Sequence, residues 1–305
     1  MRAGVRGLIV FAAVYVGLTA WGVGLAVKAS QPRYHYEVRQ DLSVHFDNAD
    51  RVIEKVRDCL KRRQSVIKIT YTARSSSLED QDELARELME LACAETDRPD
   101  EGDYIGHQLG GYNCHFTEEK QGGSHRNVIE IEPVYFTDEE QEQAVDREVS
   151  AVLEGLRLAE DADDLTKAEA VYDYVCKNVE YDFIHRKNEN YRLRSSAYGA
   201  LCHRRATCGG YAVTVYRLLR ELGVNCRVVT GTAAGEYHAW NIICINGRWY
   251  NADPTWDSLG GEDTDFLKCD TDFPDHERED EYKTESFGVG YPMAEESLVQ
   301  KGKYK

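Results

Sequence analysis

Residues 196–257 read SAYGALCHRRATCGGYAVTVYRLLRELGVNCRVVTGTAAGEYHAWNIICINGRWYNADPTWD, and this stretch decides the fold of the chain. After Cys208, apolar residues recur at helical spacing as far as Leu218 and Leu222, and Gly223 follows as a helix stop. Such a run predicts a helix that begins directly after Cys208 and packs one face against a core.

The start of a helix is a favourable place for a reactive cysteine. Free peptide N–H groups and the helix dipole stabilise an anion there, so a thiolate at Cys208 would be favoured. Gly209 and Gly210 carry no side chains beside the sulfur, and we expect a substrate backbone to approach closely at Gly209. Since a lone cysteine is more often a small buried apolar residue, the assignment depends on its neighbours.

A β-hairpin is predicted further along the same stretch. The dipeptide Asn246-Gly247 is well suited to a two-residue type I′ turn, so the flanking apolar runs should pair as antiparallel strands. The register then follows from pairing Ile245 with Arg248.

This register brings a histidine and an aspartate onto one face of the hairpin. It sets Trp240 opposite Asp253 and His238 opposite Thr255, so His238 and Asp253 become diagonal neighbours. Such neighbours lie about 7 Å apart at Cβ or somewhat less, within reach of an imidazole–carboxylate hydrogen bond. Pro254 favours an extended backbone at Asp253, and Trp240 would shield the contact from water.

These residues predict a thiol enzyme. Cys208 would attack an amide carbonyl, His238 would hold and then deliver a proton to the leaving amine, and Asp253 would orient the imidazole. The oxyanion needs hydrogen-bond donors; the backbone N–H of Cys208 is the first candidate and the side chain of Tyr198 the second.

Three blocks of this stretch resemble the core of bacterial transglutaminase-like proteins. They are Cys-x-Gly-Tyr-Ala at 208–212, His-Ala-Trp-Asn at 238–241 and Asp-Pro-Thr-Trp at 253–256, and the upstream Ala-Tyr-Gly-Ala-Leu at 197–201 is similar as well. The resemblance covers about 165–275, roughly a third of the chain.

The resemblance implies a papain-like α+β fold in which the helix bearing the cysteine packs on an antiparallel sheet. It implies Cys208, His238 and Asp253 as nucleophile, base and orienter, with no metal and no organic cofactor. The β-sandwich domains and calcium of the animal crosslinking enzymes are not expected in this chain. The paired zinc cysteines of the peptide:N-glycanases are not matched either, because the sequence has no C-x-x-C pair.

Three functions remain open at this point. The favoured one is a cysteine peptidase or amidase that acts on proteins or wall peptides, and the second is an acyl transferase that joins glutamine to an amine. The third is a binding module with a vestigial triad, or with Cys208 locked in a disulfide to Cys202 or Cys226. The expected partner is a peptide or protein substrate.

The N-terminal segment predicts a membrane anchor. Arg2 and Arg6 precede an uncharged run at 7–27, which would span about 31 Å as a helix. We therefore expect residues 1–30 to form a single-pass transmembrane signal anchor in the cell membrane, with the N-terminus inside and the catalytic domain extracytoplasmic. A cleaved signal peptide, which would leave the protein secreted, is the alternative.

Composition bounds the remaining possibilities. Acidic residues outnumber basic ones by 54 to 37, and the net charge of -17 disfavours nucleic acid as a partner. Nine cysteines in an exported protein predict disulfides with at least one cysteine left over.

Hydrophobic periodicity outlines the rest of the chain. Alternating runs at 67–71, 112–116 and 129–135 predict strands, and Thr137 followed by Glu140 predicts a capping box. The acidic stretch 271–280 is expected to form a solvated surface, with the rim of a cleft as the alternative. The predicted organisation is a small α+β domain at 36–136, a connector helix at 137–160, a transglutaminase-like catalytic domain at 161–285 and a C-terminal tail at 286–305.

Overall fold

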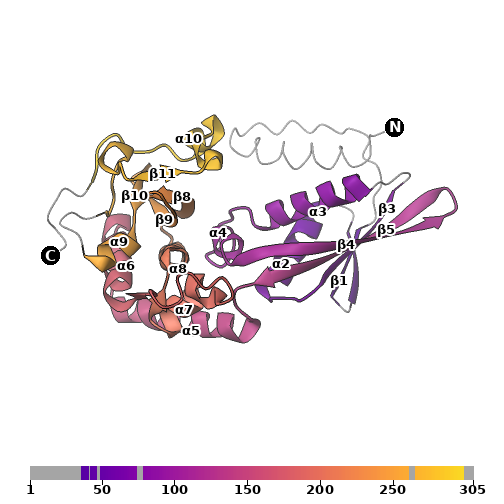
Figure 1. Ribbon diagram of the computed structural model, residues 1–305, viewed down its shortest axis with the longest axis horizontal. Coiled ribbons are helices and arrows are strands. Elements are labelled where there is room, and N and C mark those ends of the chain that lie inside the picture. The colour runs from indigo at the N-terminus through magenta and orange to yellow at the C-terminus, as the bar shows by residue number, and fades with distance from the viewer. Residues whose placement is uncertain (1–35, 41, 47–48, 74–77, 261–264, 299–305) are drawn as a thin grey trace. The chain divides into compact units, whose positions relative to one another are not determined.

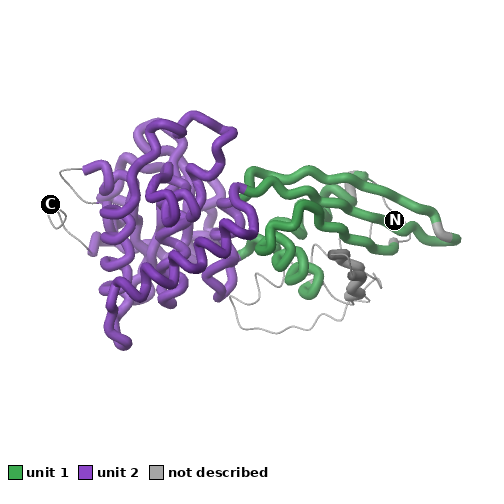
Figure 2. The backbone as a smooth tube through the Cα atoms, turned by 90° about the horizontal axis from the view of Figure 1, so that it is seen from below, with its two compact units in different colours: residues 1–94, 109–135 green, residues 95–108, 136–305 purple. Residues whose placement is uncertain are grey.

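The computed structural model describes residues 36–40, 42–46, 49–73, 78–260 and 265–298. These form a mixed α+β protein that divides into two compact units (Figure 2). Unit 1 comprises residues 1–94 and 109–135, and unit 2 comprises 95–108 and 136–305.

The described residues of unit 1 form a five-stranded antiparallel sheet and two helices, α2 and α3 (Figure 1). The strand order is β2-β1-β3-β5-β4, and α2 packs against α3. Apolar residues spaced along these helices, such as Val56 and Leu88, are buried, because each helix presents one apolar face to the unit's core. The elements are β1 (Tyr36–Gln40), β2 (Leu42–Phe46), α2 (Ala49–Lys61), β3 (Ile67–Ala73), α3 (Leu78–Ala92), β4 (Leu109–Gln121) and β5 (Ser124–Tyr135).

Unit 2 is organised around the helix α8 (Cys208–Glu221), which begins at Cys208, one residue earlier than predicted. Residues 210–219 of this helix are all buried, because α6, α7, α9 and the strands β8 and β9 surround it. A helix bearing Cys208 therefore packs on an antiparallel sheet, as predicted. The helices of this unit are α4 (Asp103–Gly106), α5 (Glu139–Leu156), α6 (Asp164–Asn178), α7 (Ala197–Cys202), α8, α9 (Pro254–Leu259) and α10 (Glu285–Gly290), with 3-10 turns η1 (Arg192–Ser195), η2 (Asp270–Asp272) and η3 (Asp280–Lys283).

The sheet of unit 2 has the antiparallel order β10-β9-β8-β11, so its last strand in the chain lies at one edge beside β8. A separate parallel pair, β6 with β7, lies just before α8. The strands are β6 (Glu180–Tyr181), β7 (Arg205–Ala206), β8 (Cys226–Ala233), β9 (Glu236–Ile245), β10 (Arg248–Ala252) and β11 (His276–Arg278).

The hairpin between β9 and β10 has the predicted register. Ile245 pairs with Arg248, and Asn246 and Gly247 have φ of 52° and 77°, as a type I′ turn requires. The pairing ends at Ala252 with Asn241, so the pairs predicted beyond it do not form. The strand stops there because Pro254 opens α9.

The helix α5 is capped one residue later than predicted. Asp138, rather than Thr137, is the N-cap, and it exchanges hydrogen bonds with Gln141 in a capping box. A carboxylate accepts from the free N–H groups more strongly than a hydroxyl does, which favours this cap.

The single-pass membrane localisation predicted from the sequence is wrong for the part of the chain that the structure describes. There, no helix is both long and apolar enough to cross a bilayer. The longest of these helices, α5, has 18 residues and carries several glutamates. Residues 7–27, on which the prediction rested, lie outside the described residues.

The expected disulfides are also absent from the structure. All nine cysteines lie in described residues and are free thiols. Cys208 is therefore not bonded to Cys202 or Cys226.

Candidate active site

Cys208 is the first residue of α8, and Thr207 precedes it as the N-cap. The hydroxyl of Thr207 does not cap the helix but lies 2.9 Å from Ser195 Oγ and donates to Arg194 O over 3.2 Å. The N–H of Gly210 already donates to Thr207 O at 2.9 Å, so the N–H groups of Cys208 and Gly209 are the ones that have no intrahelical acceptor and favour negative charge at this end.

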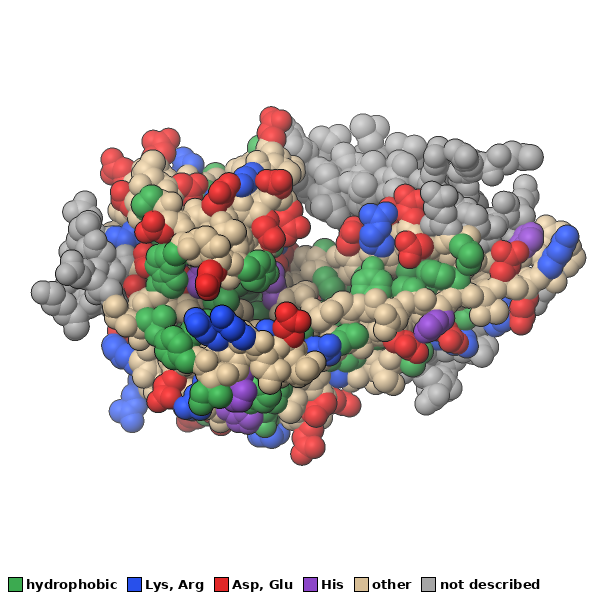
Figure 3. Space-filling view, in the orientation of Figure 1, with side chains coloured by type: hydrophobic (Ala, Val, Ile, Leu, Met, Phe, Trp, Pro, Cys, Tyr) green, Lys and Arg blue, Asp and Glu red, His purple; other side chains and the backbone are tan. Residues whose placement is uncertain are grey.

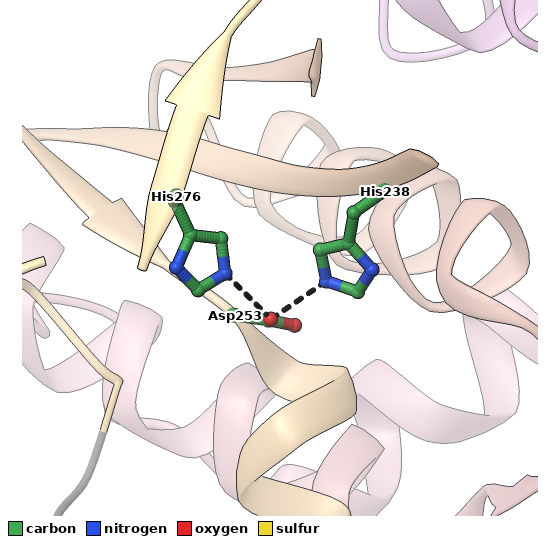
Figure 4. A group of neighbouring side chains, drawn as sticks. All are labelled: His238, Asp253 and His276. Atoms are coloured by element: carbon green, nitrogen blue, oxygen red, sulfur yellow. Dashed lines mark hydrogen bonds and ion pairs between the residues drawn. The ribbon is translucent and has the colours of Figure 1, made fainter. Parts of the chain in front are cut away.

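His238 lies near the start of β9 and contacts Asp253 as predicted. Its Nε2 lies 2.7 Å from Asp253 Oδ2 (Figure 4), and its side chain is 9% exposed. The thiol of Cys208 lies close enough to this ring to raise its pKa. Because Nε2 is used by Asp253, Nδ1 is the nitrogen that remains for the thiol.

Each carboxylate oxygen of Asp253 accepts two hydrogen bonds. It is the N-cap of α9, where Oδ1 accepts from the backbone N–H groups of Thr255 at 2.9 Å and Trp256 at 3.3 Å. Oδ2 accepts from His238 and, at 3.1 Å, from Nε2 of His276 (Figure 4). The backbone N–H groups at the start of α9 orient this carboxylate, whereas the sequence predicted that a position in a β-strand would orient it.

His276 is the site residue that sequence reasoning missed. The stretch 271–280 was expected to be a solvated surface, yet the side chain of His276 is 2% exposed. Its ring stacks on Phe273 with centroids 3.7 Å apart and lies 4.5 Å from the ring of Trp256. Most residues of 271–280 are exposed as expected, but the burial of His276 was not predicted, because β11 reaches the site by pairing with the distant β8, which no local pattern reveals.

The hydrogen bonds at the site fix the charges of its groups. Burial by itself raises the pKa of Asp253, but the hydrogen bonds from His238 and His276 outweigh it and lower the pKa to about 2. Burial lowers the pKa of His238, but its hydrogen bonds to Asp253 and Cys208 outweigh it and raise the pKa to about 10. At neutral pH His238 is therefore an imidazolium, and this cation lies beside Cys208.

The remaining predicted site residues occupy different positions. Trp240 is buried, its ring lies nearly parallel to that of His238 at 6.2 Å, and its Nε1 donates to Asn251. Gly209 is the second residue of α8, and a Cβ there would lie 3.3 Å from Ser195 Cβ. Tyr198 lies on α7 with its ring in edge contact with His203, so no described contact brings it to the triad.

A metal ion has a candidate donor set here. The ligand atoms of His238, Asp253 and His276 lie within 4.8 Å of one another. However, Asp253 Oδ2 accepts a hydrogen bond from each histidine, and an N–H that donates cannot bind a metal. The arrangement fits hydrogen bonding better than metal binding.

Comparison with known proteins agrees with the architecture of unit 2. Residues 155–254 match the family model of the transglutaminase-like superfamily. The chain is 32% and 33% identical over 113 residues to the mouse (Mus musculus) and human (Homo sapiens) proteins named kyphoscoliosis peptidase. These matches cover 33% of this chain and 17% of each relative, so the chain spans about a sixth of the curated relatives it matches. Residues 155–254 thus form a transglutaminase-like domain.

Solved structures give weaker overlaps. A crystal structure of a TGase aligns with 49% of this chain and 46% of its own, with a TM-score of 0.35 and 19% identity. A Cytophaga hutchinsonii structure provisionally described as a cysteine protease aligns with 48% of this chain and 65% of its own, with a TM-score of 0.30 and 17% identity. Overlaps of this size add nothing to the sequence match.

Proposed function

We propose that this transglutaminase-like domain is a thiol enzyme that attacks amide carbonyls, with Cys208 as nucleophile, His238 as acid and base, and Asp253 as orienter. The observation that carries the proposal is one chain of contacts. Cys208, at the start of α8, lies close enough to the ring of His238 to raise its pKa, and Nε2 of that ring lies 2.7 Å from Asp253 Oδ2. A nucleophile, a base and a group that orients the base are the parts that acyl transfer needs.

The reaction proceeds in two balanced steps. The thiolate of Cys208 attacks the carbonyl carbon, the C–N bond breaks, and the amine leaves with the proton of His238, so that a thioester remains. A water molecule then attacks the thioester and gives its proton to His238. The C–S bond breaks, the acid is released, and the thiolate of Cys208 and the imidazolium of His238 are restored.

The buried groups around the pair have supporting roles in this proposal. Trp240 covers the ring of His238 and keeps water from competing for its hydrogen bonds. His276 is a positioning residue, because its Nε2 donates to the same carboxylate oxygen as His238 and holds that oxygen in place. The N–H of Cys208 is the first donor for the oxyanion.

Hydrolysis is the form of the reaction that we propose. The relatives that match over 113 residues are named peptidases. Incubation of the protein with casein and a fluorescent primary amine distinguishes the two outcomes. New peptide termini without incorporated amine are expected, whereas amine incorporation into glutamine side chains would show a transferase instead.

Thiol labelling tests the triad without a known substrate. The full chain is treated with iodoacetamide across a pH series, and each cysteine is followed by peptide mass spectrometry. Cys208 should react fastest at pH 6 to 7, and His238→Ala should remove this advantage. Cys202 is the internal control, because it is only partly buried and burial raises its pKa.

Two outcomes would contradict the triad. One is a Cys208 that reacts no faster than Cys202 at low pH. The other is a reactivity that His238→Ala leaves unchanged, which would show that the imidazole does not activate the thiol. A Cys208→Ser chain shows that the modified peptide is assigned correctly.

A further inference from the structure

The segment just before the nucleophile has the opposite charge to the rest of the protein. Residues 183–205, here called the basic segment, contain six Lys and Arg residues and one acidic residue, a formal charge of +5. The whole chain carries -17, so everything outside the basic segment carries -22. A local reversal of this size is unexpected for a merely solvated surface, because an acidic protein keeps its solubility without it.

The basic segment is fastened to the two residues that precede Cys208. Thr207 donates its N–H to Arg194 O over 2.6 Å, and Ala206 O accepts from Asp182 N at 2.8 Å, where the segment begins. The loop is therefore positioned by the same residues that position the thiol.

A cavity of about 360 Å³ opens in this region. It is lined by Asp182, His185, Tyr191, His203 and Arg205. Asp182 is already engaged, because its carboxylate accepts from the backbone N–H of His185 at 3.0 Å and contacts that ring at 2.8 Å. The groups left to meet a ligand are cationic or neutral donors, and the volume suits a side chain of an extended peptide.

Several cations of the basic segment are available to a ligand. Arg186, Lys187 and Arg192 are exposed and make no ion pair with any described residue. Arg204 and Arg205 are paired with Glu148 and Glu180 but remain 44% and 43% exposed. Tyr181 lies near both the cation and the thiol. Burial and then Cys208 raise the pKa of Tyr181, and Arg186 lowers it.

The opposite side of the site is acidic. Tyr237, next to His238 on β9, pairs with Thr232 on β8, and Thr232 pairs in turn with Glu277 on β11. The exposed Glu277 therefore lies two strands away from Tyr237 in the same sheet. Glu236 and Glu279 are exposed there too. Figure 3 shows acidic side chains in excess over the end of unit 2 that carries β11 and α10. An anionic ligand is therefore repelled from one side of the thiol and attracted to the other.

Exposed apolar side chains lie beside both regions. Phe183 and Ile184 open the basic segment and are 62% and 73% exposed, and Tyr237, next to His238, is 67% exposed. Large exposed apolar groups beside a nucleophile are typical of a surface that binds a chain.

We propose that the basic segment binds the acidic residues of a peptide or protein substrate while the amide to be attacked lies at Cys208. This rests on the proposed function, because it names the substrate class of the same site. The carboxylates would contact Arg186, Lys187 and Arg192, with one side chain in the cavity beside Arg205. Complementary charge supplies the preference and the orientation, and the exposed apolar groups supply contact area.

Binding is measured on Cys208→Ser protein, so that no turnover is needed. The probes are fluorescein-labelled peptides with one glutamine beside a run of glutamates, a run of glutamines or a run of lysines, followed by fluorescence anisotropy. The glutamate peptide should bind about tenfold more tightly than the glutamine peptide at low salt, and the gap should shrink at 0.5 M salt.

Paired charge reversals locate the effect. R186E/K187E should remove the preference for the glutamate peptide, whereas R62E/R248E, with the same change in net charge at two other exposed positions, should keep it. Equal binding of the glutamate and glutamine peptides, or equal losses in the two double variants, would overturn the proposal. So would displacement of the glutamate peptide by heparin or single-stranded DNA at lower concentrations than by an unlabelled acidic protein.

This outcome is separable from that of the triad. If the peptides do not bind but Cys208 is labelled rapidly, the acidic substrate is rejected and the proposed thiol enzyme is retained. Tight binding with an unreactive Cys208 would reject the enzyme, and with it the assignment of the acidic peptide as substrate.

Discussion

Asp253 and Asp103 of unit 2 are both buried aspartates whose pKa values are lowered, and their partners differ in kind. Asp253 is held by the imidazoles of His238 and His276. Asp103, on α4, is held by Arg227 in two hydrogen bonds, Nε to Oδ2 at 2.7 Å and Nη2 to Oδ1 at 2.9 Å. Burial opposes ionisation at both, and the cationic or N–H partners outweigh it in each case.

The difference between the partners indicates the difference in purpose. A guanidinium stays protonated in proteins and binds a carboxylate through a rigid planar pair of donors, so Asp103 and Arg227 form a fixed link between α4 and β8. Val228 adds a backbone N–H to Asp103 Oδ2 at 2.7 Å. An imidazole can gain and lose a proton, so the same carboxylate chemistry beside Cys208 suits a reaction. The pair of Asp103 and Arg227 is here called the lock, because its expected role is to hold α4 on β8. The role proposed for Asp253 and His238 is catalysis, and variants of the two pairs distinguish these roles.

The largest effect is expected from Asp253→Asn. The substitution keeps the shape but removes the charge that orients and supports the His238 imidazolium, so amide-cleaving activity should fall about 10³ to 10⁴-fold. Asp103→Asn is the matched change at the lock, and it should lower stability while activity per folded molecule stays within about tenfold. Equal losses of activity in the two variants, compared at a temperature where both are folded, would remove the distinction.

Removing the cation of the lock should cost stability rather than activity. Arg227→Met leaves Asp103 buried without its charge partner, which typically costs about 3–5 kcal/mol. Urea unfolding followed by circular dichroism measures the loss, and iodoacetamide labelling of Cys208 below the transition checks the site. The double variant D103N/R227M should recover part of the stability, because the buried charge of Asp103 is removed together with its partner, although the longer contact of Arg227 with Glu95, at 3.6 Å, is lost as well. A further loss in the double variant would contradict the lock.

The contact between His238 and Asp253 was predicted from the sequence, whereas the pair of Asp103 and Arg227 was not. The contact between His238 and Asp253 follows from Asn246-Gly247 and a short hairpin, so local turn chemistry was enough to predict it. The manner in which Asp253 is held was not predicted, because Pro254 ends the strand and turns the aspartate into a helix cap.

The missed features depend on segments that are distant in the chain. His276 reaches the site through the pairing of β11 with β8, and Asp103 belongs to residues 95–108, which join unit 2 although they lie between elements of unit 1. Hydrophobic periodicity describes an element's own faces and contains no information on which remote element covers them.

The two pairs should respond differently to alkaline pH. The pKa of His238 is raised from its ordinary 6.5 to about 10, so the folded state binds a proton that the unfolded state releases. The stability from this pair is fully present below pH 6.5 and is lost as pH rises through 10, on the order of 1–3 kcal/mol. Unfolding free energies from pH 6 to 10 should therefore fall in the parent and fall less in His238→Gln. Parallel curves would show that the imidazole gains no proton on folding.

His276 offers a smaller test of positioning. His276→Leu removes the second N–H donor to Asp253 Oδ2, so Cys208 alkylation at pH 6.5 should slow about tenfold. His276→Gln can present an amide N–H in the same place and should restore most of the rate. A purely structural role predicts that stability falls in His276→Leu while the pH profile of alkylation keeps its shape, and that result would contradict positioning.

The smallest effect belongs to the neighbour of the lock. Glu95 accepts from the N–H of Asp103 at 2.7 Å, and its pKa is raised to about 7, first by burial and then by the charge of Asp103. An acid whose folded pKa exceeds its unfolded value of about 4.5 favours folding most at low pH, and this stability is lost as pH rises from 4.5 through 7. Glu95→Gln abolishes the titration and keeps an amide oxygen that accepts from the N–H of Asp103. Above pH 7 the variant should therefore be more stable than the parent by about 1 kcal/mol of unfolding free energy, which thermal unfolding measures as a higher melting temperature. Glu90→Gln, at an exposed position of α3, is the control and should show no such trend with pH. A loss of stability in Glu95→Gln above pH 7 would contradict this expectation. It would show that the ionised carboxylate of Glu95, 3.6 Å from Arg227 Nε, stabilises the fold through Arg227 together with Asp103.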